Sequence, residues 1–314
     1  MSAAQAQPSE AMASRDKAVS WYEASARTRV RHLLDAGSFV EFIGPEQREV
    51  SPHLSVFDLP EQFDDGIVVG RGILEGSPVF VAAQEGRFMG GAFGEVHGAK
   101  LTGLLRAARD IKSVPVLILF DTGGVRLQEA NAGELAIAEI MRAVMEARSA
   151  GAKVIGLIGG RSGCYGGGGL IAGCCSALVV SEPGRIAVSG PVVIETNRGV
   201  EEFDSRDRAL VWRTMGGKHR RLLGAADVFA DDNVQDFREA ALELLALLGP
   251  FGFDRLKAEQ RRLADRLRSF GDCGDAVDIW TAEGIAHAEA VPELPADQFI
   301  ALANRIGRTS RDAR

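Results

Sequence analysis

Cysteine is scarce in this sequence of 314 residues, and its spacing excludes several kinds of site. The four cysteines stand at positions 164, 174, 175 and 273, with no Cys-x-x-Cys pair and no histidine spacing that suits zinc. Cys174 and Cys175 fall in an apolar segment, which is typical of buried, inert thiols. Cys164 lies next to a candidate site. A nucleophilic role for its thiol is disfavoured, because the sequence places no activating base beside it. We therefore expect no metal.

Long apolar runs and an excess of positive charge are also lacking. No stretch approaches the roughly 18 uncharged apolar residues of a membrane span, and the first residues lack the layout of a signal peptide. A net charge of −7 argues against general nucleic-acid binding. With 46% apolar and 25% charged residues, the composition is typical of a globular protein, which we expect in the cytoplasm.

Nucleotide-binding and hydrolase motifs are missing too. There is no Gly-x-x-x-x-Gly-Lys-Ser/Thr loop and no Gly-x-Ser-x-Gly turn. Glycines at 159–169 approach a Gly-x-Gly-x-x-Gly pattern, but they do not follow the first strand, and no acidic residue ends a strand about 20 residues later. The sequence therefore disfavours a dinucleotide site.

The periodicity of apolar residues predicts an α/β domain. A helix is expected from Lys17 to Ala36, and the middle of the chain then alternates as β-β-α-β-α-β. The expected strands are 67–73, 79–84, 114–120 and 152–158, and the expected helices are 94–111, 127–150, 233–250 and 253–270. We divide the chain into a disordered N-terminus (1–15), a main domain (16–250), a helical extension (251–304) and a basic tail (305–314). Such alternation places a ligand beyond the strand ends.

Two glycine turns at strand ends are the most informative feature of the sequence. One is Gly166–Gly169, between Cys164-Tyr165 and an apolar helix, and the other is Gly123-Gly124, after the strand that ends at Phe120. Glycine lets the backbone approach a ligand closely, and helix starts leave N–H groups unpaired. The two turns could therefore bring two N–H groups onto one oxyanion. The alternative is that tight connections merely need small residues.

Several motifs resemble, in order, the β domain of biotin-dependent carboxyltransferases. They are Arg29–Glu41, Asp65–Gly70, Gly90–Lys100, Asp121–Glu129 and Cys164–Gly169. The resemblance covers about residues 27 to 235. Within this family, the segments 121–129, 186–195 and 215–220 are most similar to β subunits of biotin-independent malonate decarboxylases. The sequence lacks the four-cysteine zinc ribbon with which bacterial acetyl-CoA carboxylase β subunits usually begin.

The resemblance implies a crotonase-like ββα superhelix with added terminal helices, and an active site shared with a homologous γ subunit. It implies decarboxylation of a malonyl thioester on the phosphopantetheine-type arm of an acyl carrier protein, loaded by a transferase α subunit, with neither biotin nor metal. One N–H that holds the enolate should come from Val125 and the other from Gly167 or Gly168. The substrate would lie against Gly123, Gly124 and Gly166.

Three further roles stay open in the sequence. The enolate could be protonated by His97 or His219, with Glu129 and Tyr165 behind them, or by water or a partner residue; for either histidine the alternative is a structural hydrogen bond. Arg126 could hold the substrate carboxylate, or pair with Glu129 or Glu134. A basic cluster could bind the carrier or its phosphate, or form a solvated helix face. Its candidate residues are Arg206, Arg208, Lys218 and Arg220.

Two rival functions remain compatible with the motifs. The chain could be a carboxyltransferase subunit that moves a carboxyl group to or from biotin on another protein. It could also be a structural half that supplies a surface for an active partner.

Overall fold

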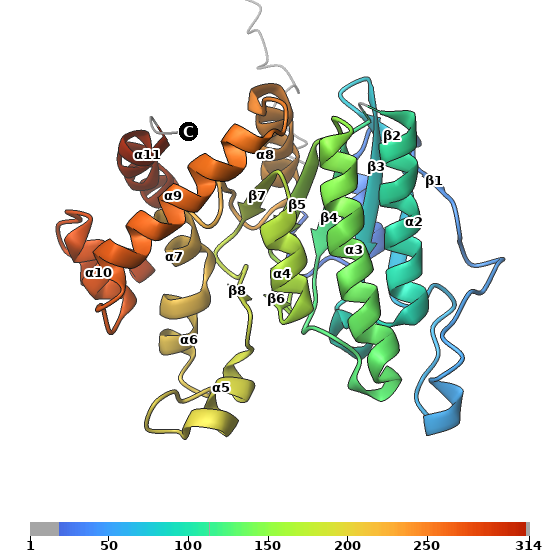
Figure 1. Cartoon of the computed structure of the whole chain (residues 1–314), viewed down its shortest axis with the longest axis horizontal. Helices are drawn as coiled ribbons and strands as arrows, with labels where there is room; N and C mark the ends of the chain where they lie inside the picture. Colours follow the sequence, from blue (N-terminus) through green and yellow to red (C-terminus); the bar gives the residue numbers. More distant parts are fainter. Residues whose placement is uncertain (1–18, 113, 312–314) are drawn as a thin grey trace, which may run out of the picture.

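A mixed sheet of seven strands lies at the centre of the computed structural model, which describes residues 19–112 and 114–311 (Figure 1). The strands run in the order β1-β2-β3-β4-β5-β7-β9; β1 to β3 are antiparallel, and β3 to β9 are parallel. Their bounds are β1 Val40–Glu41, β2 Ile67–Leu74, β3 Ser77–Gln84, β4 Val116–Phe120, β5 Val154–Ile158, β7 Ala177–Val180 and β9 Val228–Phe229. A second sheet pairs β6 (Cys164–Tyr165) with β8 (Ile186–Ala187).

Helices cover both faces of the large sheet. Side chains alternate between the faces of a strand, so Val116, Ile118 and Phe120 of β4 enter one core while Leu117 and Leu119 enter the other. The first core lies under α2 (Glu95–Ile111), α3 (Asn131–Ser149) and α4 (Gly167–Cys174). The second lies under α1 (Ala26–Leu33) and α8 (Val234–Leu247). The expected α/β class and its β-β-α-β-α-β order are confirmed.

The expected helix at 17–36 is shorter in the structure, and Lys17 and the expected disordered segment 1–15 lie outside the described residues. Helix α1 begins at Ala26, because the Ser25 side chain accepts a hydrogen bond from the Thr28 N–H and caps it. The residues before it are held by side chains instead. Trp21 stacks on Phe237 of α8 with ring centroids 3.9 Å apart.

The remaining helices lie beyond the parallel half of the sheet (Figure 1). They are α5 Pro191–Arg198, α6 Arg208–Met215, α7 Gly217–Leu222, α9 Phe253–Phe270, α10 Ala276–Ala282 and α11 Ala296–Arg311. Short 3-10 turns are η1 Ser55–Phe57, η2 Met89–Gly91, η3 Leu127–Glu129 and η4 Ala288–Glu293. Trp280 and Phe299 join the first core, so the C-terminal helices pack against the main domain. The backbone of 305–311, expected as a basic tail, belongs to α11.

Across the described ranges, no helix has both the length and the apolar character needed to traverse a lipid bilayer.

Candidate active site

The two glycine turns meet beyond the ends of β4 and β5. The Thr122 N–H donates to the Gly163 carbonyl at 2.8 Å, and the Tyr165 N–H donates to the Thr122 carbonyl at 3.0 Å. This pairing brings the backbones so close that a Cβ on Gly166 would lie 3.3 Å from the Cα of Gly124. Gly124 has φ +126° and Gly166 has φ +56°, values that favour glycine. The close approach of the two turns therefore depends on glycine at both positions.

Val125 follows the first turn with its N–H group unused. The Phe93 N–H donates to the Gly124 carbonyl at 2.8 Å, and the Arg126 N–H donates to the Phe93 carbonyl at 2.9 Å. In such a parallel bridge the bonds run to the residues on either side, so the N–H between them faces away. Among the residues that the structure describes, the Val125 N–H has no acceptor.

The second turn opens α4, whose N-cap is Gly166 and which has no side-chain cap. Gly167 and Gly168 form the first turn of this helix, where N–H groups lack intrahelical partners. Both glycines are also needed for packing. A Cβ on Gly167 would lie 2.6 Å from Cδ1 of Ile137, and a Cβ on Gly168 would lie 2.4 Å from Cγ2 of Thr122. Replacing either by valine would therefore disturb the turn as well as any bound oxyanion.

Arg126 is not available to a substrate carboxylate in this structure, which corrects that expectation. Its side chain is fully buried, and its Nη1 donates to both carboxylate oxygens of Asp65, at 2.8 and 2.9 Å. Nη1 also contacts Glu129 at 3.1 Å, and Nη2 donates to the Asp65 carbonyl at 2.7 Å. The alternative, pairing with Glu129, is therefore correct. This ionic cluster fixes the backbone next to Val125.

Both candidate histidines are buried and neutral. The ring nitrogens of His97 contact the Gln84 side chain and the Asp65 carbonyl, each at 3.1 Å, and burial holds its pKa well below the usual value. Burial lowers the pKa of His219 to about 3, and its ring lies 5.9 Å from that of Trp280. For His97 the structural role is favoured. Near neutral pH neither ring is an imidazolium, so each keeps the single N–H of a neutral imidazole.

The backbone of Tyr165 belongs to the second turn, and its phenol side chain is buried. Its hydroxyl is buried, and the Arg185 guanidinium, whose carbon lies 5.9 Å from the ring centre, is a polar group that interacts with it. Burial raises its pKa, so the phenol keeps its proton at neutral pH. The ring packs with Val211 and Met215 near α6, and the charge of Arg220 acts on it. This pairing spans 55 positions of sequence, and no local pattern in the sequence indicates it.

The candidate basic cluster divides into buried and exposed members. The Lys218 ammonium is buried and bonds to Glu182 at 2.9 Å and to the carbonyls of Pro292 and Leu294 at 2.7 and 2.8 Å. It ties α7 to the C-terminal segment, which corrects its expected role toward a carrier. Burial lowers the pKa of Arg220 to about 10, and its Nε has no partner in the described chain. Arg206 and Arg208 are exposed.

Large apolar side chains lie exposed on the elements that form or follow the turns. Leu127, two residues after Val125, is 82% exposed, and Leu170 of α4 is 44% exposed. The others are Leu135, Val188, Val192, Val193 and Val200, and we call this set the apolar rim. Exposed apolar residues close in sequence to the two turns, such as Leu127 and Leu170, are typical of a surface that another protein covers.

Comparison with known proteins finds a family model, a relative and solved structures that all belong to carboxyltransferases or malonate decarboxylases. Residues 23–249 match the family model described as carboxyl transferase domain. The malonyl-S-ACP:biotin-protein carboxyltransferase of Malonomonas rubra is 38% identical over 311 residues, which cover 91% of this chain and 96% of the relative.

Two solved structures of Pseudomonas malonate decarboxylase resemble the fold. A chain of the hetero-tetramer in complex with malonate has a TM-score of 0.78 and 40% identity, over 85% of this chain and 98% of that one. A chain of the MdcD–MdcE hetero-dimer has a TM-score of 0.65 and 38% identity, over 81% of this chain and 97% of that one. These likenesses confirm the fold class and the resemblance drawn from the motifs.

Proposed function

The chain belongs to the carboxyl transferase domain family, and from this membership we propose that it is the β-type subunit of a malonate decarboxylase. The proposed reaction converts a malonyl thioester on an acyl carrier protein into the acetyl thioester and CO2. The observation that carries the proposal is the meeting of two glycine turns beside the unused N–H of Val125. An N–H group in this position suits a developing negative charge on oxygen.

In the proposed mechanism, the bond between C2 and the carboxylate carbon breaks, and its electron pair moves toward the thioester carbonyl. CO2 leaves, and the carbonyl oxygen becomes an enolate oxygen. The N–H of Val125 and that of Gly167 or Gly168 hold this oxygen, while Gly123, Gly124 and Gly166 allow the thioester close to the backbone. One such donor is typically worth about 3–4 kcal/mol of transition-state stabilisation. These steps need neither a metal ion nor biotin.

Tyr165 is our candidate for protonating the enolate. Of the four side chains considered, His97 and His219 are neutral and buried, and both carboxylate oxygens of Glu129 are bonded, to Arg126 and to the Glu95 N–H. Burial raises the pKa of the Tyr165 phenol, which therefore keeps its proton at neutral pH beside Arg185 and Arg220. Because an arginine has only donors and accepts no proton from the phenol, the hydroxyl can donate to an enolate oxygen or carbon.

We propose that a homologous γ subunit covers the apolar rim and completes the site. Support comes from the exposure of Leu127 and its neighbours and from the hetero-oligomeric form of the Pseudomonas relatives. Arg206 and Arg208 remain the candidates for contacting an acidic carrier, since their side chains are exposed. A transferase α subunit would load the carrier.

A second candidate follows from the name of the Malonomonas relative: transfer of the carboxyl group to biotin on another protein. Both reactions would pass through the same enolate and differ in the fate of the carboxyl group. The test is release of labelled CO2 from malonyl thioester by the purified complex in the presence of avidin. Undiminished release supports the decarboxylase, and loss of release with avidin supports the biotin-dependent reaction.

A further inference from the structure

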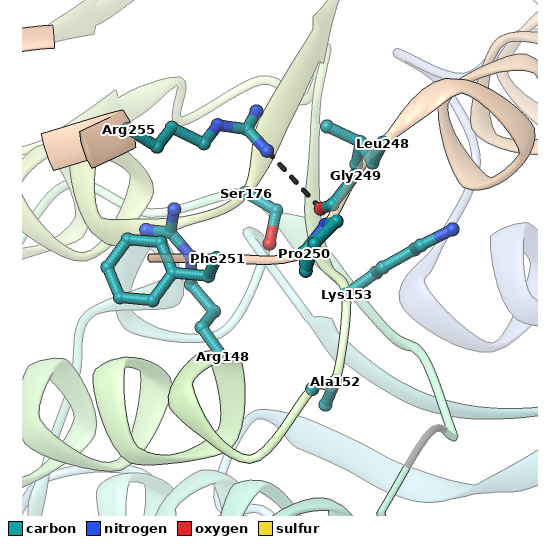
Figure 2. Close-up of a pocket in the computed structure, with 10 residues that line it drawn as sticks. Arg148, Ala152, Lys153, Ser176, Leu248, Gly249, Pro250, Phe251 and Arg255 are labelled. Carbon is teal, nitrogen blue, oxygen red and sulfur yellow. Dashed lines mark hydrogen bonds between the residues drawn. The ribbon is translucent and has the colours of Figure 1, made fainter. Parts of the chain in front are cut away.

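A basic cavity lies at the opposite edge of the sheet from the glycine turns. It has a volume of about 310 Å³, and Ala152, Lys153 and Ser176 line it where β5 and β7 begin. The turns follow the other ends of the strands. Its remaining wall comes from Arg148 at the end of α3 and from residues 248–251 and Arg255. The cavity is therefore a separate site (Figure 2).

Two guanidinium groups share this cavity without a counter-ion. Figure 2 shows Arg148 and Arg255 beside the same space. The Ser176 hydroxyl lies on the side of the arginines that faces Pro250. Neither arginine forms an ion pair with any described residue, and no acidic side chain lines the cavity. Burial lowers the pKa of Arg148, and the charge of Arg255 lowers it further. Two positive charges beside one cavity repel each other, and a bound anion would offset this repulsion.

The structure also preorganises Arg148. Its Nη1 donates to the Cys174 carbonyl at the end of α4, and its guanidinium carbon lies 4.1 Å from the centre of the Phe251 ring. Its Nε is buried and has no partner among the described residues. Arg255 has a single long contact, from Nη1 to the Gly249 carbonyl at 3.4 Å. Because Nε of Arg148 is sealed from solvent, the groups left for a ligand are Nη2 of Arg148 and Nε and Nη2 of Arg255.

Lys153 plays a different part. Its ammonium donates to the Leu245 carbonyl at 2.5 Å and points away from the two arginines (Figure 2). Lys153 adds positive charge to the wall of the basic cavity without occupying the space between the two guanidinium groups. Ser176 is held in place because its hydroxyl accepts from the Val154 N–H at 3.0 Å, and its own proton is left to donate.

We propose that this cavity binds a phosphate group, as inorganic phosphate or as the phosphate of a small monoester, between Arg148 and Arg255. A phosphate dianion matches two positive charges and offers oxygens to both guanidinium forks and to the Ser176 hydroxyl. The volume suffices for a phosphate group and a few further atoms. Malonate carries two planar carboxylates and lacks the tetrahedral set of oxygens on one atom.

Isothermal titration of the full chain tests this site with inorganic phosphate, glycerol 3-phosphate and malonate at fixed ionic strength. The variant is Arg255→Gln, and the matched control is Arg268→Gln on the same helix, where Arg268 pairs only with exposed Asp265. We expect saturable binding of one equivalent of phosphate or glycerol 3-phosphate, weakened about ten- to hundredfold by Arg255→Gln, as for a lost charged hydrogen bond. The control should bind like the unchanged chain.

The preferred probe identifies the source, since tighter glycerol 3-phosphate indicates a monoester and tighter inorganic phosphate indicates the free ion. Melting of Arg255→Gln at the temperature of the control, without ligand, shows that the fold is intact. The proposal is overturned if neither probe binds saturably, if both variants bind alike, or if malonate binds as tightly with the same dependence on Arg255.

Discussion

The guanidinium of Arg126 contacts the Asp65 carboxylate at 2.8 Å, and neither side chain has any surface exposed to solvent. The contact joins positions 61 residues apart and, with Glu129, anchors the backbone immediately after Val125. The proposed oxyanion site is thus supported by a buried ionic cluster.

Replacing Arg126 by methionine should strongly destabilise the fold, because it leaves Asp65 and Glu129 buried without a cation. We expect a loss of about 3–5 kcal/mol in the free energy of unfolding, measured with urea. The matched control is Arg106→Met, whose pair with Glu139 is exposed and should be worth less than about 1 kcal/mol. Equal losses in the two variants would contradict the assignment.

Stability should fall with acidity partly through His219. Its pKa is about 3 in the folded chain against 6.5 for the ordinary imidazole, because burial disfavours the charged form. Below pH 6.5 the unfolded chain therefore binds a proton that the folded chain does not. The contribution is complete above pH 6.5 and is lost progressively as the pH falls toward 3. Between pH 6.5 and 5.5 we expect a loss of about 1 kcal/mol from this residue.

The measurement compares urea unfolding at the two pH values for the unchanged chain and for His219→Gln. The variant should lose less stability over this interval, and His32→Gln, at an exposed position, should behave like the unchanged chain. An identical pH slope in His219→Gln would show that His219 does not carry this effect.

Much of the fold could be predicted from the sequence because its signals are local. Strands β2 to β5 are marked by apolar runs, and a glycine follows each within three residues. Helix α3 begins four residues later than expected, at Asn131, because η3 and Ala130, with φ +45°, intervene. The periodicity of apolar residues does not indicate that a 3-10 turn and a residue with positive φ precede the helix.

Side-chain partners distant in the sequence could not be predicted. The sequence shows Arg126 beside Glu129, but its main partner, Asp65, becomes a neighbour only when the sheet brings the start of β2 to the end of β4. Lys218 looks like a surface charge until α7 meets the segment at 292–294. In both cases burial converts a candidate ligand-binding cation into part of the scaffold.

Carrier recognition should depend on Arg206 and Arg208. In the double variant Arg206→Glu and Arg208→Glu, we expect the KM for carrier-bound malonyl thioester to rise about tenfold, with kcat unchanged, since exposed charges act mainly on encounter. A small malonyl thioester without carrier should be turned over as before. Steady-state kinetics of the assembled complex measure both, with the double variant Arg261→Glu and Arg268→Glu at exposed positions of α9 as the charge-matched control. An unchanged KM for the carrier substrate would rule out this contact.

Removing the Tyr165 hydroxyl should slow turnover without weakening the fold. In Tyr165→Phe the ring stays packed against Val211 and Met215, and the interaction of the hydroxyl with Arg185 is lost. If the phenol protonates the enolate, kcat should fall about 10²- to 10⁴-fold. Labelled CO2 release and melting temperature are the two readouts. Full activity in a stable variant would assign the proton to water or to the partner subunit.

The backbone N–H of Val125 is the centre of the proposed site, and proline at this position removes it while also fixing the local φ. Val125→Pro deletes a donor that bonds to no described residue, whereas Val125→Ala keeps the donor and trims the side chain. Melting temperatures of both variants check the fold. The most direct measurement is single-turnover release of labelled CO2 by the two assembled variants. We predict a loss of about 10²- to 10³-fold for the proline variant and near-normal release for the alanine variant. Equal release by two folded variants would contradict the oxyanion site.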